Sequence, residues 1–231
     1  MTLLAFNSKI VFMKHIAHIY TEFKDKFGIP RQAGLANTDG YIVFEPEFAV
    51  REAVRGLEEF SHIWLIWEFS ENVDKGWSPT VRPPKLGGNT RKGVFATRSP
   101  FRPNPIGLSC VELVKVDFDR RGPVIYVKGA DILDGSAIYD IKPYIPYCDS
   151  KPDARGSFAQ SAPAKKQVIF EAELPEEVRN IIEELLSQDP RPSYQDDPER
   201  VYGMDYGRWQ IKFKASGDKL IVIEAKERKQ L

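Results

Sequence analysis

Cysteine is scarce in this 231-residue chain, which contains only Cys110 and Cys148. Two thiols without a CxxC motif are too few for a disulfide framework or a four-thiolate metal site. We therefore expect two small buried side chains, no metal and a reducing, cytoplasmic environment. Residues 1–13 have neither a basic start nor an apolar run long enough for a signal peptide or a membrane span. We interpret them as an N-terminal extension.

Several enzyme signatures are missing as well. No GxGxxG pattern follows a strand, which argues against a doubly wound nucleotide-binding fold. The stretch from Gly88 to Gly93 has the glycine spacing of a phosphate loop, but Val94 stands where that loop needs lysine. HExxH and GxSxG are absent, and the three histidines (His15, His18 and His62) are poorly placed for a metal site. These absences disfavour an NTPase, a hydrolase and a metalloenzyme.

Acidic residues are missing from one long window of the sequence. The whole chain has 33 basic and 33 acidic residues, so its net charge is zero. Between Asp74 and Glu112, however, seven of the basic residues occur without one acidic residue, which leaves 26 basic against 33 acidic residues elsewhere. We expect a basic patch on an acidic body, suited to phosphate or another anion. A solvated basic loop without a partner is the alternative.

The sequence is rich instead in short segments of β-branched and aromatic residues bounded by Gly, Pro, Asn and Asp. These segments predict strands at 15–20, 41–44, 61–69, 93–97, 106–116, 124–128 and 138–142, with one helix at 47–59. Many short strands favour a mainly β barrel or sandwich. The strand at 61–69 is apolar on both faces, so it should lie in the core or at an interface, with its tryptophans used for packing.

The pattern changes near residues 157–164, which are typical of a connector to a small α+β unit over 161–231. A strand is expected at 168–173, followed by a helix that begins at Pro175 and ends before Asp189-Pro-Arg-Pro192. The expected buried stripe of this helix consists of Val178, Ile181, Ile182, Leu185 and Leu186. Beyond it, Trp209 to Lys214 alternates apolar with polar residues, and a turn leads to a strand at 220–224. Arg208, Lys212 and Lys214 would then form a cationic strand face.

Four segments carry polar and conformationally special residues that ordinary packing does not require. They are the Gly/Pro-bounded loop 27–34, the proline-rich stretch 77–109, the turn 131–136, and the loop 187–194 with its arginine and tyrosine. A long irregular stretch inside a compact domain usually serves a function. These segments are therefore the candidates for a binding site.

Motifs in and around these segments resemble those of the TrmO/TsaA-like family of tRNA (N6-threonylcarbamoyladenosine 37)-N6-methyltransferases. The matching stretches are Pro30-Arg-Gln, Ala53-Val-Arg-Gly-Leu-Glu, Phe60-Ser-His-Ile-Trp, Thr80-Val-Arg-Pro-Pro-Lys-Leu-Gly-Gly-Asn89, Gly93-Val-Phe-Ala-Thr-Arg-Ser-Pro-Phe-Arg-Pro-Asn-Pro-Ile-Gly107, Asp140-Ile-Lys-Pro-Tyr and Gln188-Asp-Pro-Arg-Pro. The resemblance implies a single-sheeted β-barrel domain over 14–160 that binds S-adenosylmethionine (SAM). It also implies a homodimer with the ligand near the subunit interface, and no membrane association.

The resemblance also implies a set of cofactor contacts. By motif they are Gln32, Ala33, Gly34, Ser70, Glu71, Arg98, Leu108, Leu133, Asp134, Gly135 and Ser136. Ala33 stands where the family commonly has proline, a change that a backbone contact would tolerate. Chemically, Arg98 suits the SAM carboxylate and Asp134 suits the ribose diol or the ammonium group. An ordinary hairpin turn is the alternative for Asp134-Gly135, and the sequence nominates no general base.

For the tRNA anticodon loop, the candidate contacts are Arg82, Lys85, Arg91 and Arg102, with Tyr194, Tyr202 or Tyr206 as a platform for an unpaired base. Two other functions remain open: a non-catalytic SAM- or RNA-binding barrel, and a methyltransferase for a small metabolite. The apolar strand 63–69 and the segment from Arg82 to Lys85 are the predicted surfaces of a two-fold dimer.

Overall fold

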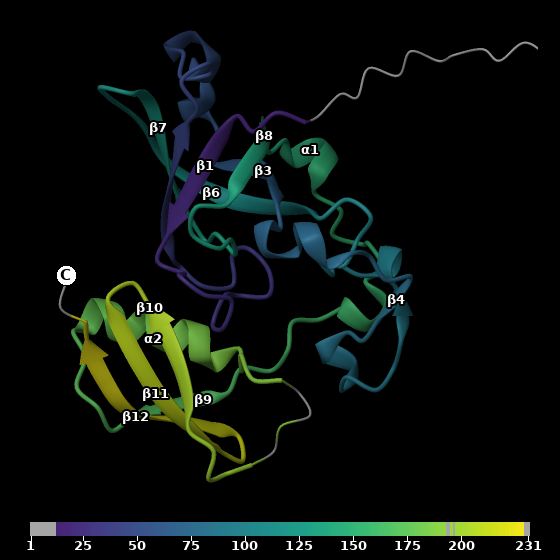
Figure 1. Ribbon diagram of the computed structural model, residues 1–231, viewed down its shortest axis with the longest axis vertical. Helices are drawn as coiled ribbons and strands as arrows, with labels where there is room; N and C mark the ends of the chain where they lie inside the picture. The colour runs from purple at the N-terminus through teal and green to yellow at the C-terminus, as the bar shows by residue number, and fades with distance from the viewer. Residues whose placement is uncertain (1–12, 193–194, 196, 229–231) are drawn as a thin grey trace, which may run out of the picture.

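The computed structural model describes residues 13–192, 195 and 197–228. The chain forms a closed β-barrel and a separate smaller sheet with its own helix (Figure 1). Barrel strands follow the order β1-β2-β7-β6-β3-β8. Their bounds are β1 Ala17–Thr21, β2 Asp39–Phe44, β3 His62–Glu68, β6 Ile106–Asp119, β7 Gly122–Lys128 and β8 Ala137–Pro143. The predicted fold class, mainly β with a barrel followed by a small α+β unit, is confirmed.

Alternation of side chains along the strands fills the barrel, because neighbouring residues of a strand point to opposite faces. On β3 the inward residues Ile63, Leu65 and Trp67 are buried. The outward Trp64 is half-buried and donates a hydrogen bond from Nε1 to Asp149 Oδ2 at 2.9 Å, from the short helix α1 (Pro146–Asp149). The second apolar face of this strand is therefore covered in part by the same chain.

Two predictions of secondary structure are wrong, the helix at 47–59 and the strand at 93–97. The segment 47–59 forms no α-helix but two 3-10 turns, Arg51–Val54 and Leu57–Glu59, because Gly56 between them adopts a left-handed conformation with φ of 83°. The predicted strand 93–97 is reduced to β5 (Lys92–Gly93), which pairs with β4 (Thr80–Val81) and is followed by a 3-10 turn. Cys148, expected to be buried, is exposed, and Cys110 is half-buried.

The C-terminal unit is a sheet in the order β10-β11-β12-β9 with one helix against it. Its elements are β9 Gln167–Phe170, α2 Glu176–Ser187, β10 Tyr202–Tyr206, β11 Trp209–Ser216 and β12 Lys219–Glu227. Ile182, Leu185 and Leu186 of α2 pack with Phe213 and Val222 of the sheet, as the predicted apolar stripe required. The boundary at residue 160 stays a prediction.

The segment between β1 and β2 joins the barrel to the C-terminal unit. Phe23 and Ala36 from this segment are buried in the C-terminal core, and the Gly207 N–H donates to Glu22 O at 2.9 Å. Gly28 has a φ of +97°, and a Cβ there would overlap the Met204 side chain. The segment that follows β1 is thus packed between the two units.

No helix within the described residues is long and apolar enough to cross a bilayer.

Candidate functional site

The loop that carries Gln32, Ala33 and Gly34 lies on the end of the barrel. Gly34 adopts a positive φ of 75°, and its N–H donates to the carbonyl of Gly129, just after β7, at 2.8 Å. Ala33 packs against the barrel core. We call residues 32–34 the cofactor loop, after the role that the sequence predicts for them.

Arg98, from the proline-rich stretch, reaches this loop. Its Nη1 donates a hydrogen bond to Gln32 Oε1, and Gln32 Nε2 in turn donates to the carbonyl of Arg31. Arg98 is otherwise exposed. The structure therefore brings together two of the predicted cofactor residues that are 66 positions apart in the sequence.

A partly buried carboxyl group, Asp131, lies behind these residues. Ser109 Oγ donates to Asp131 Oδ1, and Trp67 Nε1 donates to the same Ser109 Oγ at 2.9 Å. Burial raises the pKa of the Asp131 carboxyl, while the hydrogen bond from Ser109, the nearby Arg98 and the Ala33 amide act in the opposite direction. Asp131 thus connects the barrel interior, through Trp67 and Ser109, with the cofactor loop.

The turn Leu133–Ser136 is fixed to β1 rather than left open. Asp134 accepts hydrogen bonds from the Thr21 N–H at 2.9 Å and from Lys24 Nζ at 2.6 Å. The Gly135 N–H donates to Ile19 O, and Ser136 Oγ donates to Leu133 O. Both carboxylate oxygens of Asp134 are therefore in use, and a ligand that bound this group would have to replace Lys24 or add to it.

Among the described residues, no hydrogen bond or ion pair joins the remaining cofactor candidates to Gln32 or Arg98. Ser70 and Glu71 begin the 3-10 turn Ser70–Lys75, and Glu71 forms an ion pair with Lys26 at 3.4 Å. Leu108 points out of the barrel wall and is 54% exposed. A cleft of about 450 Å³ lies beside the loop, with Gly34, His62, Cys110 and Glu184 in its lining. The predicted set therefore forms an open surface in one chain.

Three of the four arginine and lysine residues predicted to contact phosphate already donate hydrogen bonds within the chain. Arg91 donates to Thr80 Oγ1 at 2.7 Å, and Lys85 Nζ donates to the carbonyl of Ser161. Arg102 is half-buried and donates to the carbonyl of Thr97 at 2.8 Å. Arg82 is exposed and forms no hydrogen bond or ion pair among the described residues. Tyr194 lies outside the described residues, whereas Tyr202 and Tyr206 are buried and unsuited to stacking with a base.

The expected cationic face of the C-terminal sheet is neutralised. Arg208 pairs with Glu227, Lys212 with Glu224, and Lys214 with Glu199. The partners come from β12 and from the loop before β10, which the linear sequence does not place opposite β11. The face is therefore mixed in charge rather than basic.

Ser109 and Asp131 lie at the ends of the candidate segments 77–109 and 131–136, but sequence reasoning gave neither residue a role in the site. The sequence did carry a signal for Asp131, because this charged residue stands between apolar neighbours, Ala130 on one side and Ile132 and Leu133 on the other. A lone carboxylate in such surroundings is costly to bury unless it is hydrogen-bonded, and that cost marks it for attention. Ser109 carried no comparable signal, because its partners come from two distant strands.

The fold is a closed β-barrel with a second, α+β unit docked beside it, and the candidate site is a polar loop at the end of the barrel that Arg98 contacts. The tRNA-methyltransferase O N-terminal domain matches residues 18–150, and the TrmO C-terminal domain matches residues 157–228. The chain therefore belongs to the tRNA-methyltransferase O family.

Comparison with individual relatives gives the same family. The tRNA (adenine(37)-N6)-methyltransferase of Escherichia coli is 43% identical over 208 residues, which cover 85% of this chain and 88% of that protein. A Pseudomonas aeruginosa relative, whose name refers to SAM-dependent methyl transfer, is 41% identical over 202 residues, covering 82% and 86% of the two chains. The crystal structure of TrmO from P. aeruginosa superposes with a TM-score of 0.74 at 32% identity, covering 96% of this chain and 99% of that one.

The raised pKa of Asp131 predicts a pH dependence of stability. Because the folded protein binds this proton more tightly than the unfolded chain, this group's contribution to the free energy of unfolding falls as the pH rises from about 3.9 to the raised pKa. In Asp131→Asn that contribution is absent, so the stability of the variant relative to the parent should increase with pH through this window. Urea unfolding at a series of pH values measures the difference.

Asp117→Asn is the matched control with the opposite sign. A hydrogen bond from Lys115 lowers the pKa of Asp117, so its stabilising contribution is present above the unfolded pKa and is lost as the pH falls. The relative stability of this variant should therefore decrease as the pH rises. Equal trends in the two variants would contradict the assignment of a raised pKa to Asp131.

Proposed function

We propose that this protein transfers a methyl group from SAM to N6 of adenosine 37 in tRNA, with N6-threonylcarbamoyladenosine as the acceptor nucleoside. The observation that carries the proposal is the position of the Arg98 guanidinium. It contacts Gln32 of the cofactor loop and lies near the Asp131 carboxyl group. The activity for which the E. coli relative is named supports the substrate. An enzyme that modifies tRNA for use in translation would work in the cytoplasm.

The residues at the cofactor loop fit SAM chemically. The SAM carboxylate needs a cationic donor, and Arg98 already binds a carbonyl-type oxygen, Gln32 Oε1, in the same place. Exposed backbone at Gly34 allows a ligand to approach the main chain closely. We propose that Gln32, Ala33, Gly34 and Arg98 hold the ligand, with Ser70, Glu71, Leu108 and Leu133–Ser136 as further contacts.

Methyl transfer depends mainly on the alignment of the sulfur, the methyl group and the acceptor nitrogen. SAM would supply a methyl group on a sulfonium. The carbon–sulfur electron pair would stay on sulfur, so that S-adenosylhomocysteine leaves as a neutral thioether, while a carbon–nitrogen bond forms at N6 and the N6 proton passes to water. The chain's residues would contribute by fixing the donor and the acceptor in line, which can supply about 7–11 kcal/mol in favourable cases. Arg98 would fix the amino-acid end of the donor, and Asp131 would fix the loop beneath it.

A transfer assay tests the function. The protein is incubated with SAM labelled in the methyl group and with bulk tRNA from a strain that lacks the gene, and the label is mapped by nuclease digestion. We expect label in the anticodon loop at adenosine 37. A parallel reaction with a small-molecule extract of the same strain in place of tRNA covers the metabolite alternative. Label in that extract alone would indicate a metabolite methyltransferase, and SAM binding without transfer in either reaction would indicate a non-catalytic barrel; either result contradicts the proposal.

Removing the Arg98 guanidinium should weaken SAM binding. Arg98→Ala loses a charge-assisted hydrogen bond of about 1.5–3 kcal/mol, or roughly a 10- to 150-fold higher dissociation constant. Calorimetric titration measures the affinity. Arg121→Ala is the control, since this arginine pairs with Asp119 at the distant β6–β7 turn. Unchanged affinity in Arg98→Ala would remove this residue from the site.

Among the predicted phosphate-binding arginine and lysine residues, Arg82 offers the cleanest test because the others also donate hydrogen bonds within the chain. Arg82→Glu should raise the KM for tRNA and make its salt dependence shallower, with a slope reduced by about 0.9 for each phosphate that is no longer bound. SAM affinity should stay the same. Arg55→Glu, an exposed arginine outside the basic window, is the control. A salt slope equal to that of the parent would refute a role for Arg82 in phosphate binding.

We also propose that the protein is a two-fold homodimer and that the dimer completes the open cofactor surface. Large apolar side chains support this: Trp77 is 55% exposed, Phe95 73%, Phe101 41% and Leu108 54%. Phe101 O accepts a hydrogen bond from the Ser78 N–H, so Trp77 and Phe101 come from adjacent segments. Exposed aromatic side chains are enriched at protein–protein contacts, and two-fold contacts are the commonest kind.

Dilution should then weaken cofactor binding, because only the assembled state binds well. Sedimentation velocity at several concentrations gives the dimer constant, and calorimetric titration above and below it gives the SAM affinity. We expect a lower apparent affinity below the dimer constant. A monomer that binds SAM as tightly as the concentrated protein would contradict the dimer proposal.

A further inference from the structure

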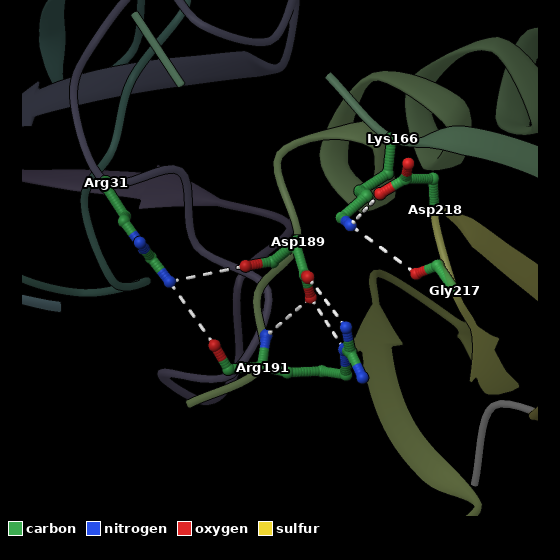
Figure 2. Close-up of polar contacts among 6 residues, drawn as sticks. All are labelled: Arg31, Lys166, Asp189, Arg191, Gly217 and Asp218. Atoms are coloured by element: carbon green, nitrogen blue, oxygen red, sulfur yellow. Dashed lines mark hydrogen bonds and ion pairs between the residues drawn. The ribbon is translucent and has the colours of Figure 1, made fainter. Parts of the chain in front are cut away.

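Arg31 lies between the cofactor loop and the C-terminal unit. Its Nη2 donates to the carbonyl oxygens of Asp189 and Arg191, each at 3.3 Å (Figure 2). Both acceptors belong to the stretch Asp189-Pro-Arg-Pro192, which leads away from helix α2. Arg31 itself immediately precedes Gln32, so a single side chain spans from the predicted cofactor site to a loop 158 residues further along the chain.

The loop that Arg31 reaches is stiff. Asp189 has a φ of 51°, a left-handed conformation that is costly for a residue other than glycine. Its carboxylate holds the Arg191 guanidinium in a bidentate pair, with Nε–Oδ1 at 2.7 Å and Nη2–Oδ2 at 2.8 Å. Prolines flank Arg191 on both sides. Arg191, part of the candidate loop 187–194, is folded back against its own loop, and the backbone carbonyls are the groups presented to Arg31 (Figure 2).

The other end of the connection is the cofactor site itself. The carbonyl of Arg31 accepts from Gln32 Nε2, and Gln32 Oε1 accepts from Arg98. A displacement of Arg31 therefore moves an acceptor that orients Gln32, which in turn holds Arg98. Continuous hydrogen bonds link the Asp189–Pro192 loop to the guanidinium proposed to bind the SAM carboxylate.

Neighbouring contacts anchor the same segment to helix α2 and to its C-terminal end. The Asn37 N–H donates to Glu184 Oε2 at 2.6 Å, and Gln188 Nε2 donates to Leu35 O at 3.1 Å. Arg31 differs from these residues in two ways. Its side chain binds the loop beyond the helix, and its own carbonyl accepts from the Gln32 side chain.

We propose that Arg31 is a positioning residue that couples the cofactor loop to the Asp189–Pro192 loop. A ligand bound at the cofactor loop would slow the local opening of the Asp189–Pro192 loop that permits hydrogen exchange. The inference rests on the proposed function only in taking residues 32–34 as the SAM loop. It assigns the C-terminal unit a part in shaping the cofactor site, and it requires no contact between Arg31 and either substrate.

Hydrogen exchange of the full-length protein tests the coupling. Exchange is followed in peptides that cover residues 32–34 and 188–192, with and without SAM at a concentration that saturates each variant. In the parent we expect SAM to slow exchange in both peptides, by about fivefold or more at the Asp189 and Arg191 amides, the lower end of typical couplings. In Arg31→Ala the first peptide should still be protected by SAM, and the second should not respond.

Two further variants make the result specific. Arg31→Lys keeps the charge but offers a single ammonium in place of the planar guanidinium, so it should restore part of the response. Arg121→Ala removes an exposed arginine elsewhere and should behave as the parent. A response at 188–192 in Arg31→Ala equal to that of the parent, or no response in the parent, would overturn the coupling. Failure of SAM to protect residues 32–34 in the parent would instead contradict the proposed cofactor site.

Discussion

The site depends on one partly buried carboxyl group, Asp131, and on its hydrogen bond from Ser109. A carboxyl group in such surroundings is costly unless donors surround it, and here donors come from two sides. Ser109 reaches it from the barrel interior, with Trp67 behind, and the Ala33 amide reaches it from the cofactor loop. The packing of the barrel and the position of the loop are therefore not independent.

Glycine at 107 is part of the same arrangement. Trp67 pairs opposite Gly107 in the β3–β6 ladder, and a Cβ at this position would overlap the indole ring. The ring can lie flat over β6 and place its Nε1 on Ser109 only because no side chain stands there. The glycine that ends the Pro-Asn-Pro-Ile-Gly motif thus has a packing reason, which acts on the site through Ser109 and Asp131.

Prediction from sequence worked where periodicity alone decides the structure. The strands of the barrel and the stripe of Ile182, Leu185 and Leu186 on α2 followed from alternation and helical spacing. It failed at 47–59, where apolar spacing resembles a helix but Gly56 breaks it, and it missed β10, whose alternating Tyr202, Met204 and Tyr206 carried a usable signal.

For the candidate site, the family motifs predicted Gln32 and Arg98, and the structure brings these two into contact. Charge was harder to predict, because it depends on partners across the fold. Lys212 has no evident partner in the linear sequence, but Glu224 on the neighbouring strand pairs with it. Arg191 likewise looks available to a substrate until Asp189 is seen to hold it. Pairings of this kind follow from register and loop conformation, which residue spacing does not encode.

The central claim is that SAM occupies the cofactor loop with its carboxylate on Arg98. A crystal structure with S-adenosylhomocysteine, the demethylated product, measures this directly. We predict a ligand carboxylate oxygen about 2.7–2.9 Å from an Arg98 guanidinium nitrogen, beside the hydrogen bond to Gln32 Oε1, with Asp131 still bound to Ser109. A ligand whose carboxylate lies away from Arg98 would contradict this claim.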